Sequence, residues 1–374
     1  MSHQVVISGV GVWHPQESIT NEELVNSYNA YVDAFNSENK DKIEAGEVNA
    51  MPYSSAEFIE KASGIKSRYI YKKEGALDIA RMKPKIEPRA DDELSHQAEI
   101  AVEAAKLALA SANLEASDID AVIVSCAYTQ RAYPAIAIEV QEALNIEGFG
   151  FDMLVACSAA TFGMHRAYEM LCAGNATRVL LINPELVSPQ INYTDRDSHF
   201  IFGDVSTATV LELADTAKGE HVYDVLSTKA LTKFSNNIRS NFGYMTRAED
   251  VDPYGPDKLF HQAGRKVFKE VCPMAAAHIE AHLASHDITP EGVKRWYLHQ
   301  ANINMNTLIC KRLLGREANR EEAPIVLDEF ANTASAGSVI AFGLNHKDLV
   351  SGDVGVLCSF GAGYSIGSLV IRKR

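Results

Sequence analysis

The chain has 374 residues, of which 47% are hydrophobic, and a formal net charge of −14 at pH 7. This length exceeds the size at which one hydrophobic core usually stops growing, so we expect two domains or two fused core layers and little disorder. The negative charge opposes general binding to nucleic acid or to an anionic membrane.

The first half of the chain alternates predicted strands with predicted helices. Residues 5–13 are apolar and predict a strand, after which Thr20 or Asn21 caps a helix. Residues 94–113 have the periodicity of a long amphipathic helix. The segments that follow predict a strand, a helix, a short strand ending at Cys157, a helix and two more strands: AVIVSCA, EVQEALN, FDMLVA, the stretch after Cys157, RVLLINPE and ATVLELA.

The second half repeats this organisation. Residues 110–127 align without gaps on residues 284–301, and both segments have the order helix, turn and buried strand. Few identities support the alignment, but the shared order indicates a duplicated α/β unit whose two halves pack face to face. We therefore divide the chain into an N-terminal half, residues 1–215, and a C-terminal half, residues 216–374.

Two segments fit this pattern least. Residues 30–56 and 70–92 are rich in Asn, Lys, Glu and Pro and have weak periodicity. Long connections of this kind are often surface insertions or functional loops. We expect them to form surface insertions or a mobile cap.

The sequence also argues against targeting segments and metal sites. The N-terminus has no basic region before a long apolar run, and no segment reaches about 18 apolar residues, so we expect a cytoplasmic protein without membrane insertion. The six cysteines form no C-x-x-C pair and have no His at a zinc spacing. We interpret them as reduced thiols and expect neither a disulfide framework nor a metal site.

Three distant residues are candidates for chemistry. Cys157 follows an apolar strand and precedes small residues that should start a helix, whose N-terminus would lower the thiol pKa. The alternative is an inert buried Cys. His299 ends the apolar strand WYL, where α/β folds place reactive groups, although it could be a structural hydrogen-bonding residue. Asn332 lies in a loop of small residues and by itself would be a turn residue.

Four motifs resemble, in order and spacing, those of β-ketoacyl-[acyl carrier protein] synthase III in the thiolase superfamily: ACSAATFG, HQAN, NTASAGS and FGAGYSIGS. The resemblance extends over most of the chain. It implies a five-layered αβαβα fold made of two related halves, usually assembled as a homodimer. It also implies decarboxylative Claisen condensation of an acyl-CoA primer with malonyl-acyl carrier protein through an acyl-cysteine intermediate.

The resemblance assigns the catalytic residues. Cys157 matches the acylated nucleophile, and His299 and Asn332 match the pair that binds the malonyl thioester carbonyl. Two neutral N–H donors stabilise an enolate without supplying a proton that would quench it. Backbone N–H groups of Cys157 and Ala362 match the oxyanion hole, where the family's usual glycine is Ala362, so its dihedral must tolerate a methyl group.

Matches to the substrate-binding residues follow the same resemblance. Phe58 stands where the family often has a Trp on the adenine of coenzyme A, and Arg196 matches the Arg on the other side of that ring. Asn302 matches a pantetheine contact. Tyr133 matches an aromatic residue that reaches across the dimer and limits acyl-chain length, although its identity leaves the chain length open.

The carrier-protein contact departs from the family pattern. Two positions where the family has basic residues are Ala62 and Asn304 here. Arg265 and Lys269 share a helical face and could replace part of that basic surface. The alternative is an ordinary solvated helix, with CoA rather than a carrier protein bearing the malonyl group.

Other functions would need different residues. A thiolase-like or hydroxymethylglutaryl-CoA synthase-like enzyme would also use an acylated Cys, but it typically needs a different acid and base. A non-catalytic partner subunit would have no need of Cys157, His299 and Asn332 together. A metal hydrolase is disfavoured because the sequence has no ligand cluster. We therefore expect a condensing acyltransferase that needs no redox cofactor or metal.

Overall fold

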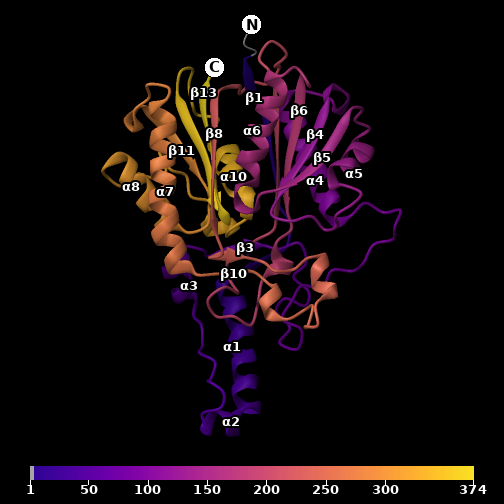
Figure 1. The fold of residues 1–374 in the computed structure, drawn as a ribbon, viewed down its shortest axis with the longest axis vertical. Coiled ribbons are helices and arrows are strands. Elements are labelled where there is room, and N and C mark those ends of the chain that lie inside the picture. The colour runs from indigo at the N-terminus through magenta and orange to yellow at the C-terminus, as the bar shows by residue number, and fades with distance from the viewer. Residues whose placement is uncertain (1–3) are drawn as a thin grey trace.

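The computed structural model describes residues 4–374, whose elements surround one nine-stranded sheet (Figure 1). The sheet order is β11-β12-β13-β8-β1-β7-β6-β4-β5. Its strands are β1 Val5–Trp13, β4 Ala121–Cys126, β5 Phe149–Leu154, β6 Arg178–Glu185, β7 Val205–Leu213, β8 Tyr223–Ser235, β11 Val293–Leu298, β12 Val354–Gly361 and β13 Gly363–Lys373. The short strands outside it are β2 Ser18–Thr20, β3 Ser67–Tyr69, β9 Ile238–Arg239 and β10 His261–Gln262.

The α-helices are α1 Asn21–Glu38, α2 Lys40–Glu44, α3 Ala56–Ser63, α4 His96–Ala112, α5 Ile136–Leu144, α6 Ala159–Cys172, α7 Gly264–Ala284, α8 Ile303–Leu314, α9 Leu327–Phe330 and α10 Gly337–Leu344. Short 3-10 helices connect several of them: η1 Ala116–Asp118, η2 Ala156–Ser158, η3 Ser188–Gln190, η4 Tyr244–Ala248, η5 Pro256–Lys258, η6 Pro290–Gly292 and η7 Ala334–Ala336.

Most predicted elements are confirmed. The strand predicted at residues 5–13 is β1 Val5–Trp13. Thr20 is the N-cap of α1, because its hydroxyl accepts the Glu23 N–H while the Glu23 carboxylate accepts the Thr20 N–H. The helix predicted at residues 94–113 is α4, which begins and ends slightly inside those limits.

The sheet is two half-sheets joined by a narrow seam between β1 and β8. That seam pairs two residues of β1 with two of β8, whereas β8 and β13 pair along most of their length. Helices α6 and α10 lie between the half-sheets and contact both, α4 and α5 cover one outer face, and α7 and α8 cover the other (Figure 1). These five layers confirm the expected αβαβα fold.

The duplicated unit is also visible. In the first half α4, η1 and β4 follow one another, and in the second half α7, η6 and β11 do the same. The boundary predicted between residues 215 and 216 falls between β7 and β8. That the two halves are separate domains stays a prediction.

The central strands are apolar along their whole length because both of their faces are buried. In β4, Ile123 packs into the central core around α6 and α10, while Val122 and Val124 pack into the outer core under α4 and α5. Successive side chains point to opposite faces, so a strand buried on both faces is a continuous apolar run. The same rule places Leu357 of β12 in the central core and Val356 under α7 and α8.

The two weakly patterned segments form a cap at the end of the sheet away from the termini (Figure 1). The first segment begins with the second half of helix α1, which projects from the body, and continues with α2. Residues 45–55 run back along α1 through hydrogen bonds such as Asn36 to Met51. The second segment is mostly irregular, but Ile70, Ala76 and Met82 are buried in a fourth core with residues around Phe202. No helix within residues 4–374 is long and apolar enough to cross a membrane.

A buried histidine network lies between α7 and the sheet. His278 Nε2 and His282 Nδ1 both contact Ser368 Oγ, at 2.9 and 2.7 Å, and His282 Nε2 contacts Ser227 Oγ at 2.8 Å. Burial lowers the pKa of both imidazoles from 6.5 to about 4. The folded protein therefore holds both rings neutral over a range in which the unfolded chain binds protons.

These depressed pKa values predict acid sensitivity. Stability from the network is fully present above pH 6.5 and is lost as pH falls toward about 4, by roughly 1–3 kcal/mol per histidine. Urea unfolding at about pH 7 and about pH 5 measures the difference. The double variant His278→Gln, His282→Gln should show a smaller loss than wild type, whereas His261→Gln, at an exposed position in β10, should leave the loss unchanged. An equal loss in wild type and double variant would contradict this assignment.

Candidate active site

Cys157 lies in η2, between the end of β5 and the start of α6, as the sequence predicts. It is half-buried. Ala156, which precedes it, has a φ of 45°. This left-handed backbone is costly for alanine, by about 1–3 kcal/mol, and such strain is concentrated at functional sites.

The predicted lowering of the thiol pKa is wrong for the resting protein. Burial raises the pKa of Cys157 to about 12, the nearby Glu185 carboxylate adds to this, and backbone N–H groups of Ala362 and Cys157 oppose it. Helix α6 begins two residues after Cys157, and desolvation outweighs what its N-terminus and the two amides contribute. Cys157 is therefore a neutral thiol at pH 7.

The hairpin between β12 and β13 lies directly against Cys157. A Cβ added at Gly361 would lie 2.5 Å from Cys157 Cβ and 3.0 Å from its sulfur, so only glycine fits at this position. The backbone N–H of the next residue, Ala362, is close enough to the thiol to oppose the rise of its pKa. Positive φ in this turn falls on Gly363 at 128°, and Ala362 is not among the positive-φ residues of the described chain. The alanine methyl is therefore tolerated.

His299 follows β11 and is almost completely buried. Its backbone N–H donates to the Cys358 carbonyl at 2.8 Å, and its ring meets Phe360 edge-on with centroids 5.3 Å apart. Burial lowers the pKa of His299 to about 4. Its Nδ1 has no hydrogen-bond partner in the described part of the chain. At pH 7 the ring is therefore neutral, as a donor that must not protonate a carbanion needs to be.

Asn332 is buried and held on both sides by backbone. Its N–H donates to Ile201 at 2.9 Å, and its carbonyl accepts the Gly203 N–H at 3.1 Å. Its Oδ1 accepts the Ala334 N–H at 3.0 Å, so the Nδ2 group remains available as a donor. The flanking Ala331 and Ala334 have φ values of 56° and 49°, which is a second strained stretch of backbone.

The end of β12 brings these residues together. Phe360 contacts His299 while the adjacent Gly361 contacts Cys157. The turn η7, which follows Asn332, packs against η2, which holds Cys157. Cys157 is thus brought into one water-poor region with His299 and Asn332, which follow it by 142 and 175 positions in the chain.

The predicted adenine pair is also in contact. The Arg196 guanidinium lies 3.8 Å from the centre of the Phe58 ring, and Arg196 Nε donates to the Tyr53 carbonyl at 2.7 Å. An adenine between the two groups would need a spacing of roughly 7 Å, twice a contact distance. Here the two side chains stack on each other, so nucleotide binding would require Arg196 to move away from Phe58.

Asn302 has a structural role in addition to the predicted one. Its Oδ1 caps α8 by accepting the Asn304 N–H at 2.9 Å, and its Nδ2 donates to the Ala62 carbonyl at 2.7 Å. This bond places Ala62 beside the start of α8, so the two positions without the family's basic charge are neighbours. The predicted pantetheine contact stays a prediction.

Arg265 and Lys269 are exposed on α7, which packs against α8. Neither forms an ion pair within residues 4–374. The substitute basic surface predicted from the sequence is therefore available beside the helix that carries Asn304.

Tyr133 lies in the loop between β4 and α5, and 77% of its surface is exposed. Strand β5 forms the edge of the sheet, with Phe149 and Leu154 exposed at its two ends. Unpaired edge strands with apolar side chains are expected to be covered. The loop of Tyr133 lies near this edge, since the Ile136 N–H donates to Asp152 of β5, and the Tyr133 side chain is exposed to solvent there.

Glu185 also belongs to the site, although it is not among the residues predicted from the sequence. Glu185 ends β6, is completely buried, and accepts hydrogen bonds from Ala127 and Ser335. The sequence contains a signal for it, since a carboxylate at the end of an apolar strand is unusual. What it contacts could not be predicted, because Ser335 is distant in the chain.

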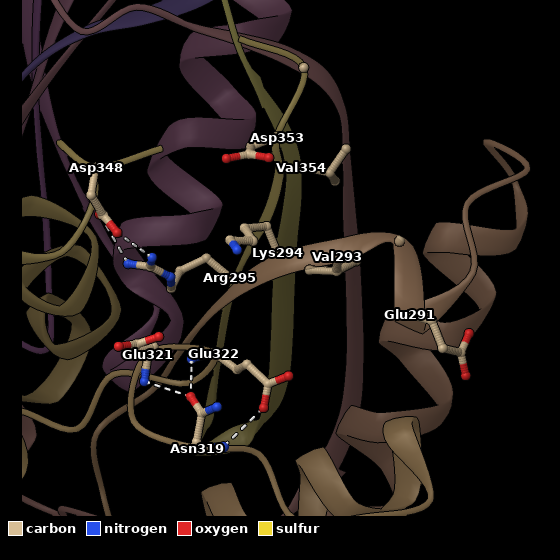
Figure 2. A pocket seen from close by; sticks show the side chains of 12 residues that line it. Glu291, Val293, Lys294, Arg295, Asn319, Glu321, Glu322, Asp348, Asp353 and Val354 are labelled. Atoms are coloured by element: carbon tan, nitrogen blue, oxygen red, sulfur yellow. Dashed lines mark hydrogen bonds and ion pairs between the residues drawn. The ribbon is translucent and has the colours of Figure 1, made fainter. Parts of the chain in front are cut away.

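A hollow with charged walls lies elsewhere. Figure 2 shows it at the start of β11, where Arg295 pairs with Asp348 at 2.7 Å beside Lys294 and Glu322. His299 follows the other end of the same strand, about 20 Å away. The hollow is therefore separate from the candidate active site.

Known protein families match both parts of the site. The family described as 3-Oxoacyl-[acyl-carrier-protein (ACP)] synthase III matches residues 151–230, which contain Cys157. The corresponding C-terminal family matches residues 283–373, which contain His299 and Asn332.

Individual proteins extend the match to nearly the whole chain. A beta-ketodecanoyl-[acyl-carrier-protein] synthase from Pseudomonas aeruginosa is 54% identical over 348 residues, covering 93% of this chain and 99% of that protein. A beta-ketoacyl-[acyl-carrier-protein] synthase III from Mycobacteroides abscessus is 28% identical, covering 99% and 95%. The crystal structure of 3-oxoacyl-[acyl-carrier-protein] synthase III from Aquifex aeolicus has the same fold, with a TM-score of 0.76, 23% identity and coverage of 98% and 99%.

The contact between Gly361 and Cys157 predicts the effect of a single methyl group. Gly361→Ala should displace the nucleophile or the hairpin and slow alkylation of Cys157 by iodoacetamide by roughly tenfold or more, because a Cβ would lie 2.5 Å from Cys157 Cβ. Peptide mass spectrometry measures the rate at this site. Gly292→Ala is the matched control, because its Cβ would meet nothing closer than 3.7 Å. Wild-type reactivity in Gly361→Ala would refute the close approach.

Proposed function

The chain belongs to the 3-oxoacyl-[acyl-carrier-protein] synthase III family of condensing acyltransferases, and we propose that it joins an eight-carbon acyl-CoA primer to malonyl-acyl carrier protein through an acyl-Cys157 intermediate. The observation that carries this proposal is the meeting of Cys157, the Ala362 amide and the neutral His299 at the end of β12. Cys157 is the nucleophile, the Ala362 N–H donates a hydrogen bond to the oxyanion, and His299 donates one to the enolate.

The first half-reaction transfers the primer. The Cys157 sulfur attacks the thioester carbonyl, the bond to the CoA sulfur breaks, and the thiol proton leaves with CoA. The resulting oxyanion accepts hydrogen bonds from the N–H groups of Cys157 and Ala362. Because the resting thiol is neutral, its proton must be lost during the transfer rather than before it.

The second half-reaction forms the carbon–carbon bond. The malonyl group loses carbon dioxide, and the enolate oxygen accepts hydrogen bonds from His299 and Asn332 Nδ2. The carbanion attacks the acyl-Cys157 carbonyl, and collapse of the oxyanion releases the β-ketoacyl thioester. Cys157 then takes up a proton from solvent. The reaction balances without a redox cofactor or a metal, and we propose that the enzyme needs neither.

The choice of primer length rests on the relative from Pseudomonas aeruginosa. Its name gives a β-ketodecanoyl product, and the condensation adds two carbons, so its primer has eight. At 54% identity over nearly the whole chain, the same product class is the best-supported proposal here. CoA as the primer carrier is supported by the pair of Arg196 and Phe58, which would have to separate to admit an adenine between them.

We also propose that the enzyme acts as a homodimer joined along β5. The supporting observations are the unpaired edge of this strand, its exposed Phe149 and Leu154, and the outward projection of Tyr133. In such a dimer Tyr133 of one protomer would close the acyl tunnel of its partner.

Replacing the three catalytic residues should separate the two half-reactions. Cys157→Ala should abolish acylation by octanoyl-CoA, while His299→Ala and Asn332→Ala should retain acylation and lose condensation by roughly a hundredfold or more, because their donors act on the enolate. Intact-protein mass spectrometry before and after a malonyl-carrier chase measures both steps. A full acyl adduct on Cys157→Ala would disprove the nucleophile, and unchanged condensation in either other variant would remove that residue from the mechanism.

The basic surface on α7 predicts a salt-dependent carrier contact. Replacing Arg265 and Lys269 together by Ala should raise KM for malonyl-carrier protein several-fold at low salt, with little effect at high salt, because exposed charges are screened. KM for acyl-CoA should stay unchanged. Arg320→Ala is a matched control, since Arg320 is an exposed cation that already pairs with Asp328 at 3.0 Å. Unaltered carrier kinetics at every salt concentration would favour malonyl-CoA as the extender.

The proposed position of Tyr133 at the end of the acyl tunnel predicts that this residue limits the length of the primer's acyl chain. Tyr133→Ala should shift kcat/KM toward longer primers by roughly tenfold per lost contact, since one methylene in an apolar pocket contributes about 1–3 kcal/mol. The comparison uses short, eight-carbon and long acyl-CoAs, after sedimentation has shown that parent and variant have the same assembly state. An identical profile would show that Tyr133 does not set the limit.

A further inference from the structure

Glu185 is a buried carboxylate at the active site with an unusual set of partners. Its two oxygens both accept the Ala127 N–H at 3.1 Å, and Oε1 also accepts the Ser335 N–H at 3.2 Å and the Ser335 hydroxyl. No cation acts on it within the described residues. By contrast, Glu212 near the other end of the neighbouring strand β7 pairs with Arg178 at 2.9 Å. A fully buried carboxylate without a cation is costly, so its retention calls for a reason.

The segments that Glu185 holds are those that carry the proposed chemistry. Ala127 begins the loop that carries Tyr133, and Ser335 lies in η7, three residues after Asn332. The η7 turn packs in turn against η2, which holds Cys157. The Glu185 carboxylate therefore connects the loop of Tyr133 with the turn that follows Asn332. Through the packing of η7 on η2 it is also connected to Cys157.

Glu185 also acts on the nucleophile through its charge. The carboxylate raises the pKa of the Cys157 thiol, after the larger effect of burial. Burial raises the pKa of Cys126, and Glu185 adds to this effect. Burial also raises the pKa of Tyr128, with smaller contributions from Asp204 and Glu185. Burial raises the pKa of Glu185 itself to about 7. Its charge therefore changes in the range where the enzyme would work, while Cys126 and Tyr128 stay neutral.

We propose that Glu185 is a positioning residue of the condensation reaction, which holds the Asn332 turn and the Tyr133 loop through its oxygens and, when ionised, adds to the effect of burial in disfavouring the Cys157 thiolate. This inference rests on the proposed roles of Cys157, His299 and Asn332. A neutral resting thiol resists oxidation and metals, because the thiolate is the reactive form. It gains reactivity when a primer fills the site and its carbonyl is polarised.

Two substitutions separate the geometry from the charge. In Glu185→Gln the side-chain oxygen can accept all three donors that Oε1 accepts now, so the charge is lost together with only the second contact of the Ala127 N–H, to Oε2. In Glu185→Asp the charge is kept, but the carboxylate is withdrawn by one methylene and the hydrogen bonds lengthen. Glu212→Gln is the matched control, because Glu212 is an equally buried glutamate on the neighbouring strand.

The test measures alkylation of Cys157 by iodoacetamide from about pH 5 to about pH 9 in the full-length protein, with peptide mass spectrometry to assign the site. Wild type should show a break near pH 7, above which ionised Glu185 slows the rise in rate. Glu185→Gln should lack the break and react about tenfold faster at high pH, but equally fast at low pH, where wild-type Glu185 is protonated. Glu185→Asp should keep the break and lose malonyl decarboxylation by roughly tenfold or more.

The outcomes distinguish this inference from the proposed function. If octanoyl-CoA acylates Cys157 in wild type while Glu185→Gln gives the wild-type alkylation profile, the charge effect is refuted. If Glu185→Asp decarboxylates malonyl-carrier protein at the wild-type rate, the positioning role is refuted. The same holds if Glu212→Gln changes Cys157 alkylation and malonyl decarboxylation as much as the Glu185 variants do. If wild type is never acylated at Cys157, the proposed function itself fails. Thermal unfolding of each variant verifies that it is folded.

Discussion

The close approach of Gly361 to Cys157 is the constraint on which the rest of the site depends. The nucleophile belongs to the first half of the chain and the hairpin after β12 to the second, so this contact joins the halves at the point of reaction. It leaves no room for a side chain at position 361, and it brings the Ala362 amide to the sulfur. The adjacent residue Phe360 contacts His299, so the end of β12 positions both the nucleophile and the residue that donates to the enolate.

Burial then determines the charge state of every group in the site. It lowers the pKa of His299 to about 4 and raises that of Cys157 to about 12, so both are neutral at pH 7. A site without formal charge suits a reaction whose charges appear only on the oxyanion and the enolate. Preorganised backbone and amide donors stabilise those charges more strongly where water is excluded. Glu185 is the exception, and its pKa of about 7 makes it the group that can still change charge.

How much of this could be predicted from the sequence depends on the range of the interactions. Strand β1 and the Thr20 cap follow from local pattern, and the motifs around Cys157, His299 and Asn332 identify the site because each combines a reactive residue with small neighbours. The thiol pKa was predicted wrongly, because local sequence shows the helix start but not the desolvation by distant segments.

Contacts between distant segments were the least predictable part. The bond from Glu185 to Ser335 and that from Asn302 to Ala62 join residues 150 and 240 positions apart. No local periodicity reports such pairs. The projection of α1 was also missed, since its helical pattern fades into a polar segment that sequence alone describes as an insertion.

The most direct test of this account is a crystal structure of the octanoyl-enzyme. The proposed mechanism predicts a thioester on Cys157 whose carbonyl oxygen lies about 2.7–3.1 Å from the backbone nitrogens of Cys157 and Ala362, with His299 and Asn332 Nδ2 facing the space where the malonyl group would enter. An acyl group on a different cysteine, or a carbonyl oxygen directed at His299 and Asn332 with the two backbone donors unoccupied, would contradict it.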